Sequence, residues 1–283
     1  MAHSFSRFIY FDTNILSHLA KTRSMWSRLS EYLVRHDLTI AVGSQVAELA
    51  DVASLHEALA NMLLVAPSAL IKPWNEVLLE EVNAHPNMRK ETLCLYPLNG
   101  LILEQPGPQK LLDFFSSGPL KEARHGQLES ARQLASRHSE LKPNFPPGKS
   151  GYTKTQALEF AWIQVLQWLA HDHLHFLKQF QEDATKLNAH VFQSVRLSAL
   201  VLFYKYYLGN RNPTKLSDFG DSFHLYAIPY CEIAVMERDL TNVLGQIKRN
   251  DAVLEFTDIY NIDFLIDWPP PSRDNLVHDG ERP

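Results

Sequence analysis

The chain has 283 residues, of which 45% are hydrophobic and 21% are charged, a globular composition that excludes a disordered, collagen-like or low-complexity protein. Its net charge of −5 argues against a protein that coats nucleic acid by bulk charge. Two cysteines are too few for a disulfide framework, and neither a membrane-spanning apolar run nor a signal-peptide pattern is present, so we expect a cytoplasmic protein without membrane contact.

The first part of the chain alternates short strands with helices. Residues 8–11 form a β-prone apolar run, and turn residues at 12–14 separate it from a helical pattern that begins at Ile15. A second helix over 24–35 leads into the apolar strand 38–42, and a further helix follows. This alternation predicts βαβ units and a parallel sheet with both faces covered.

The middle of the chain, residues 73–210, has helical patterns and few strand-like runs, which predicts a helical insertion. The clearest helices are expected over 158–180 and 191–208. The proline-, glycine- and lysine-rich stretch 141–154 predicts an exposed loop.

The α/β pattern returns near the end of the chain. The expected elements there are a helix over 216–228, a strand over 231–236, a helix over 240–248, and strand-like or short closing elements at 253–256 and 264–266. We therefore expect residues 1–72 and 211–283 to form one discontinuous α/β domain around the insertion.

Four acidic residues recur just after a strand or on the first turns of the next helix: Asp12, Glu48, Asp221 and Asp239. Ligands bind at the carboxyl edge of an open parallel sheet, where these side chains would meet. Carboxylates gathered there repel one another unless a hard divalent cation neutralises them, and Mg²⁺ and Mn²⁺ prefer oxygen ligands.

Each acid also has a simpler interpretation. Asp12 and Asp239 could cap the helices that follow them, and Glu48 could be a solvated helix residue. Asp218 and Asp221 could be partners of a helix dipole. The recurrence of the same position at four places favours the metal site.

These residues also carry a resemblance to a known family. The string FIYFDTNILSHL resembles the opening of a PIN domain, in which a strand ends in Asp, a small hydroxyl residue and Asn. Glu48 in SQVAEL and Asp221 in SDFGDSFH match the second and third acidic positions of that family. The ending PYCEIAVMERDL is similar to the last PIN strand, with Asp239 as the final acid. The chain departs from the family at residues 236–239, Met-Glu-Arg-Asp, where relatives carry a threonine.

The resemblance implies a PIN-like three-layer α/β/α fold with a central, mainly parallel sheet, interrupted by the large α-helical insertion. It also implies Mg²⁺- or Mn²⁺-dependent hydrolysis of phosphodiester bonds, usually in single-stranded RNA. The implied catalytic metal ligands are Asp12, Glu48, Asp221 and Asp239, with Asp218 as a further ligand. The residues expected to support them are Thr13, Asn14 and Glu237, and those expected to contact substrate are Arg238, Lys149 and Lys154.

The charge divides unevenly along the chain. Residues 73–210 carry a net +1, whereas the two ends together carry −6, so the acidity lies with the proposed metal ligands. In the insertion, Lys149 and Lys154 stand beside Phe145 and Tyr152, and cations interleaved with aromatic rings suit single-stranded nucleic acid.

Other functions stay open at this point. The chain lacks the glycine-rich and serine motifs of dinucleotide binding, P-loop hydrolysis and esterase chemistry. The alternatives to a ribonuclease are a catalytically silent PIN-like module that binds RNA or a protein, and a structure-specific DNA nuclease. A protein partner or a homo-oligomer is compatible with each of them.

Overall fold

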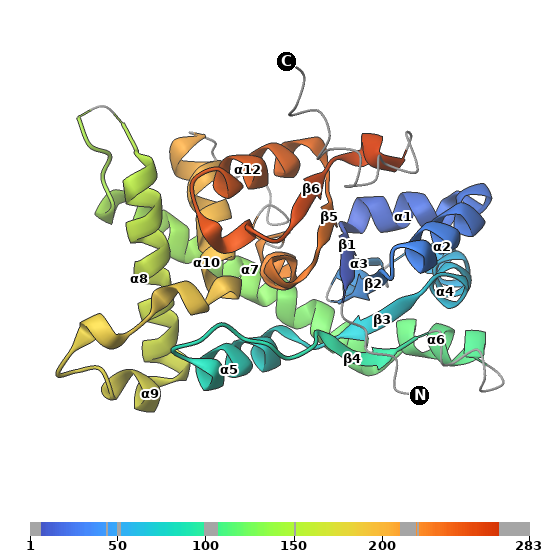
Figure 1. Ribbon diagram of the computed structural model, residues 1–283, viewed down its shortest axis with the longest axis horizontal. Helices are drawn as coiled ribbons and strands as arrows, with labels where there is room; N and C mark the ends of the chain where they lie inside the picture. The colour runs from blue at the N-terminus through green and yellow to red at the C-terminus, as the bar shows by residue number, and fades with distance from the viewer. Residues whose placement is uncertain are drawn as a thin grey trace, which may run out of the picture.

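The computed structural model describes residues 7–43, 45–49, 52–98, 107–149, 151–209, 219 and 221–265. Its centre is a sheet with the strand order β4-β3-β2-β1-β5-β6 (Figure 1). The strands are β1 (Phe8–Phe11), β2 (Thr39–Val42), β3 (Ser68–Ile71), β4 (Cys94–Pro97), β5 (Ile233–Val235) and β6 (Asp258–Tyr260). Neighbouring strands are parallel, except that β4 runs antiparallel to β3 at one edge.

Helices make up most of the remaining described chain. The α-helices are α1 (Thr13–Lys21), α2 (Trp26–Arg35), α3 (Gln45–Leu49), α4 (His56–Val65), α5 (Trp74–Ala84), α6 (Gly107–Phe115), α7 (Gly118–Asn144), α8 (Lys154–Asp172), α9 (Leu174–Lys178), α10 (Gln193–Phe203) and α12 (Arg238–Lys248). The shorter 3₁₀ segments are η1 (Arg23–Met25), η2 (Ala53–Leu55), η4 (Ala184–Lys186), η5 (Ala189–Val191), η7 (Asp221–Tyr230), η8 (Ala252–Leu254) and η9 (Ile262–Leu265), and η6 (Tyr204–Leu208) is a π-helix.

Both faces of the sheet are covered by helices. In β1, Phe8 and Tyr10 point to one face and Ile9 and Phe11 to the other, as the two-residue period of a strand requires. Side chains from α1, α2, α4 and α6 cover the second face, while α8, α10, η7 and α12 contribute to the first. The predicted α/β class with a mainly parallel sheet is confirmed, and this layering is compatible with an α/β/α arrangement.

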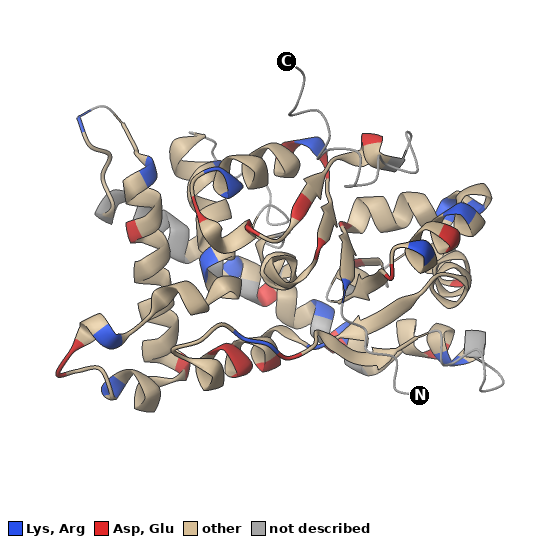
Figure 2. Cartoon of the chain, in the orientation of Figure 1, with Lys and Arg blue, Asp and Glu red and all other residues tan. Residues whose placement is uncertain are grey.

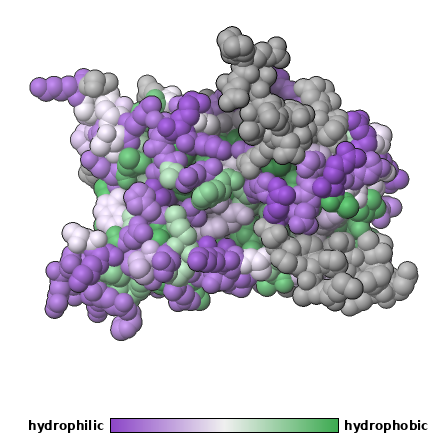
Figure 3. All heavy atoms as spheres, in the orientation of Figure 1, coloured by the Kyte–Doolittle hydropathy of each residue, from purple (hydrophilic) through white to green (hydrophobic). Residues whose placement is uncertain are grey.

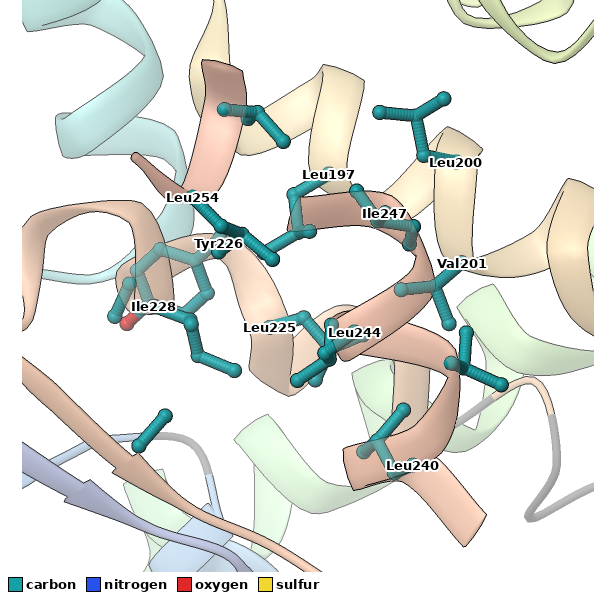
Figure 4. Close-up of a cluster of buried hydrophobic side chains, with 14 of the residues drawn as sticks. Leu197, Leu200, Val201, Leu225, Tyr226, Ile228, Leu240, Leu244, Ile247 and Leu254 are labelled. Atoms are coloured by element: carbon teal, nitrogen blue, oxygen red, sulfur yellow. The ribbon is translucent and has the colours of Figure 1, made fainter. Parts of the chain in front are cut away.

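The core on the first face is built where α10, η7 and α12 meet. Figure 4 shows their apolar side chains pointing toward one another: Leu197, Leu200 and Val201 from α10, Leu225, Tyr226 and Ile228 from η7, Leu240, Leu244 and Ile247 from α12, and Leu254 from η8. Burying one Leu or Ile side chain stabilises a fold by roughly 1.5–3 kcal/mol. This cluster therefore anchors the C-terminal part of the chain to α10, which belongs to the predicted insertion.

The insertion shares its core with the sheet. One continuous cluster contains Tyr10 and Ala41 of the strands together with Phe160, Leu197 and Phe203 of the helices. The structure also adds an element to 73–210 that the sequence analysis did not expect, the edge strand β4. The segment 73–210 therefore packs directly on the α/β core and contributes a strand to it.

Several predicted boundaries shift in the structure. The helix expected over 158–180 is divided at His173 into α8 and α9. Of the two alternatives for 253–256, a strand or a short closing element, the structure has the second: the 3₁₀ segment η8, whose cap Asp251 accepts a hydrogen bond from the Val253 amide at 2.8 Å. The strand that closes the sheet is β6, a few residues later. Within the described ranges, we find no helix that combines the length and apolarity needed to cross a bilayer.

Charged and apolar residues are interspersed on the surface. Figure 2 shows basic and acidic positions distributed over both ends of the molecule, and Figure 3 shows a mostly hydrophilic face with small separate groups of hydrophobic residues. Scattered exposed hydrophobic residues are normal for a globular protein. The acidic residues singled out by the sequence, in contrast, are placed by the topology at one edge of the sheet.

Candidate active site

The strand order places a topological switch point at β1. From β1 the chain passes outward through β2 and β3 on one side, and later returns through β5 and β6 on the other. Open parallel sheets bind ligands outside the carboxyl ends of their strands at such a point. Asp12 follows β1 directly, Glu48 lies on α3 after β2, and Glu237 follows β5 by two residues. Three predicted site residues therefore leave neighbouring strands at the same edge.

Asp12 is fixed by the backbone at the junction of β1 and α1. Its amide donates to the Val235 carbonyl of β5 at 3.0 Å, which prolongs the strand pairing by one residue. Its side chain is the N-cap of α1 and accepts a hydrogen bond from the Thr13 amide at 2.8 Å. The capping role considered for Asp12 is confirmed, and it orients one carboxylate oxygen toward the helix terminus.

A tight turn after β2 positions Glu48. The buried side chain of Gln45 accepts from the Gly43 amide at 3.0 Å and donates to the Ala41 carbonyl at 2.8 Å, so it closes the turn from both ends. A Cβ at position 43 would lie 2.9 Å from the end of the Ile71 side chain, so a larger residue there would have to displace Ile71. Helix α3 begins at Gln45 and carries Glu48 within its first turn.

The Glu48 carboxylate is engaged on both oxygens. Oε1 lies 2.9 Å from Arg124 Nη1 of α7 and 3.2 Å from His224 Nε2 of η7, while Oε2 accepts from the Thr13 hydroxyl at 3.1 Å. Burial opposes ionisation of this carboxyl, but His224, Arg124 and the Thr13 hydroxyl outweigh burial and lower the pKa of Glu48 to about 2. Glu48 is therefore an anion held between two basic side chains.

Asp12 has the opposite electrostatic setting. Burial raises the pKa of Asp12, and the carboxylates of Glu237 and Glu48 raise it further, against the bond from Thr13 and the charge of His224. Glu237 in turn accepts a hydrogen bond from the side-chain amide of Asn14. Asp12 and Glu237 thus form a pair of mutually repelling acids, with Asn14 holding the second of them.

The remaining predicted acids are placed less completely. Asp239 is half-buried in the first turn of α12. Asp218 lies outside the described residues. The backbone of Asp221 begins η7, but its side chain is outside the described part of the chain. Glu237, predicted as a supporting residue, acts electrostatically on Asp12, as Glu48 does.

The predicted substrate-binding residues lie apart from this cluster. Arg238 is exposed and its Nη2 pairs with the Asp263 carboxylate at 3.0 Å. Lys149 and Lys154 are exposed in and after the loop between α7 and α8, which projects at the α8 end of the molecule (Figures 1 and 2).

The two aromatic residues of that loop are turned toward the core. Phe145 packs edge-on against Phe160 and Phe203, and Tyr152 packs against Phe203 and Tyr207. The Tyr152 hydroxyl also donates to the Phe145 carbonyl at 2.9 Å. Their rings are therefore used for packing, and only the lysines of the loop are presented to solvent.

The described side chains allow a test of whether a divalent cation fits. Asp12 is a partly desolvated carboxyl whose pKa the carboxylates of Glu237 and Glu48 raise, a setting that a cation would relieve. Both Glu48 oxygens already have partners. No group of three metal-ligating side chains forms among the residues that the structure describes. Asp12 is therefore the described acid whose burial a hard cation would relieve, whereas the charge of Glu48 is already compensated by Arg124.

Sequence reasoning missed Arg124 as a site residue. His224 is 3% exposed and contacts Glu48 directly, and its position three residues after Asp221 was the available signal. Arg124 had no such signal, because its contact depends on how α7 packs against α3.

No family model matches the chain, and no match was found among curated protein sequences or solved structures. The functional argument therefore rests on the geometry of the site.

Proposed function

We propose that the chain is a PIN-like, Mg²⁺- or Mn²⁺-dependent nuclease that hydrolyses phosphodiester bonds in single-stranded RNA in the cytoplasm. The observation that supports this most strongly is the convergence of Asp12, Glu48 and Glu237 from three neighbouring parallel strands at the switch point of the sheet. A partly buried acid whose pKa is raised by neighbouring carboxylates, as that of Asp12 is, is typical of functional sites. A purely structural role would not require acids at all three strand ends.

The residues of the chain have distinct tasks in this proposal. Asp12, Glu48 and Glu237 hold the cation, together with the predicted ligands Asp221 and Asp239. A divalent cation bound by such carboxylates lowers the pKa of a water molecule and stabilises the charge that develops on the phosphate.

The supporting residues orient the acids before substrate arrives. The Thr13 amide directs one oxygen of Asp12, and the Thr13 hydroxyl directs Oε2 of Glu48, so a single residue couples the two acids. Asn14 orients Glu237 in the same way. The string Asp-Thr-Asn therefore supplies one acid of the cluster, Asp12, and two residues, Thr13 and Asn14, that each hold another acid in place.

Substrate binding would come from exposed cations around the cluster. Arg238 stands directly after Glu237, and its guanidinium is exposed apart from the pair with Asp263. Lys149 and Lys154 supply positive charge for an RNA strand that is long enough to reach the α8 end of the molecule. Their contribution is electrostatic, because the aromatic rings beside them pack inward.

A second candidate is favoured by one specific observation. Arg124 and His224 neutralise Glu48 without a metal, as they would in a catalytically silent PIN-like module that binds RNA or a protein. In that case the acid cluster is a polar network, and no cation binds at the switch point. The two candidates make opposite predictions for Mn²⁺.

Cleavage assays separate these possibilities. Labelled single-stranded RNA, single-stranded DNA and flap DNA are incubated with the wild type, with Asp12→Asn and with Asp113→Asn, a control that removes an exposed carboxylate of α6. We expect RNA cleavage that requires Mn²⁺ or Mg²⁺, that Asp12→Asn abolishes, and that the control retains.

The other outcomes are equally informative. Cleavage confined to DNA would replace the RNA substrate by a DNA one. Binding of RNA without cleavage in any metal would favour the silent module, and cleavage that survives Asp12→Asn would refute the site.

A further inference from the structure

Helix α7 brings the positively charged side chain of Arg124 from the inserted segment to the acid site. Its start is fixed by Ser117, whose hydroxyl accepts from the Leu120 amide at 3.4 Å, and by Leu120, which is buried in the core on the α1 face of the sheet. Arg124 follows Leu120 by four residues and therefore lies on the same side of the helix, one turn further along. In Figure 1, α7 runs from the region of β4 and α6 toward α8, behind α10. Arg124 is thus presented to α3 by a helix that is anchored in the core.

The contact between Arg124 and Glu48 is close and partly shielded from water. Arg124 Nη1 lies 2.9 Å from Glu48 Oε1, and the two side chains are 22% and 19% exposed. Oε1 is the oxygen that His224 also contacts, while Thr13 holds Oε2. The guanidinium therefore pairs with one oxygen of the carboxylate that the proposed reaction uses as a cation ligand.

We propose that Arg124 is a positioning residue that competes with the divalent cation for Glu48. While Arg124 is paired, α7 keeps Glu48 out of the coordination sphere. A cation that took Oε1 would displace Arg124, and Thr13 would still hold Oε2. This inference rests on the proposed metal-dependent function. It adds that Arg124 raises the cation concentration needed to occupy the site.

The size of the competition depends on how often the Arg124–Glu48 pair is formed. A ligand that binds only one of two states has an apparent affinity reduced by the fraction of molecules in that state. If the Arg124–Glu48 pair is formed about 90% of the time, the cation binds about tenfold more weakly than it would without the pair. A lysine at this position would keep the charge without the planar fork of a guanidinium, and would compete less well.

Calorimetric titration with Mn²⁺ alone tests the proposal. The proteins are the wild type, Arg124→Lys, Arg124→Gln, and Arg132→Gln, a control for an exposed arginine of the same helix that pairs with Glu129. We expect the affinity for Mn²⁺ to rise in the order wild type, Arg124→Lys, Arg124→Gln, with about a tenfold span. Arg132→Gln should bind like the wild type, and circular dichroism without metal checks that each variant is folded.

Each result bears on the proposal. Equal or weaker Mn²⁺ binding by Arg124→Gln overturns the competition, and if the wild type still binds Mn²⁺ the proposed function is untouched. If one variant does not fold, the other still gives the direction of the change. Failure of the wild type and of every folded variant to bind Mn²⁺ overturns both the competition and the metal-dependent function.

Discussion

Glu81 on α5 is a carboxyl group with no exposed surface, and its ionisation should control how stability depends on pH. Its Oε1 accepts hydrogen bonds from the Ser194 amide at 2.9 Å and from the Tyr230 hydroxyl. Its Oε2 is buried with no hydrogen-bond partner among the described residues. Burial raises the pKa of Glu81 to about 7, against the opposing effect of the bonds from Tyr230 and Ser194.

The sign and size of the effect follow from linkage. The ordinary pKa of this carboxyl is 4.5, so between pH 4.5 and 7 the folded state holds a proton that the unfolded state has released. Folding stability contributed by that proton is complete below pH 4.5 and is lost as the pH rises through 7. At 1.36 kcal/mol for each pH unit, the loss is about 3 kcal/mol. Glu81→Gln keeps an acceptor oxygen and cannot ionise, so it should not show this loss.

Urea unfolding at pH 5 and pH 8 measures the effect. The free energy of unfolding of the wild type should fall between these values by about 2–3 kcal/mol more than that of Glu81→Gln. Glu159→Gln, which removes an exposed carboxylate of α8, controls for the change in net charge. Parallel pH profiles for the wild type and Glu81→Gln would refute the reasoning.

Three further substitutions test the site and its surroundings. Asp12→Asn should raise the melting temperature at neutral pH, because burial and Glu237 raise the pKa of Asp12, so that ionisation of Asp12 destabilises the folded state. A fall of several degrees in the melting temperature, measured by calorimetry, would contradict this. His224→Ala should destabilise by about 2 kcal/mol in urea unfolding, because it removes the buried imidazole that lies 3.2 Å from the Glu48 carboxylate, and no change would show that this contact does not contribute. Arg196→Ala should cost about 3–5 kcal/mol, because it leaves the buried Asp251 carboxylate without its ion-pair partner; a loss below 1 kcal/mol would contradict the pair.

The fold was predictable where a strand or helix carries its own periodic pattern. The run 8–11 and the pattern after Asp12 gave β1 and α1 because the buried residues recur at the spacing of each element. The edge strand β4 was missed because Leu95 and Tyr96 are exposed, so the sequence shows no alternation between core and solvent. Its pairing with β3 is made by the backbone, which sequence patterns do not report.

The site was predictable to the extent that it follows from strand ends. Asp12 and Glu48 come after β1 and β2, so the parallel topology alone brings them to one edge. The influence of Glu237 on Asp12 depends on where β5 ends and α12 begins. Arg124 lies 76 residues from Glu48, and no local pattern reports a contact across that separation.

The most direct test of the whole account is a crystal structure of the protein soaked in Mn²⁺, with anomalous scattering measured at the manganese edge. The account predicts an anomalous peak bound by the Asp12 carboxylate at the carboxyl edge of the sheet, with Glu48 turned to it and Arg124 displaced from Glu48. A structure at saturating Mn²⁺ with no peak near Asp12 and the Arg124–Glu48 pair intact would contradict it.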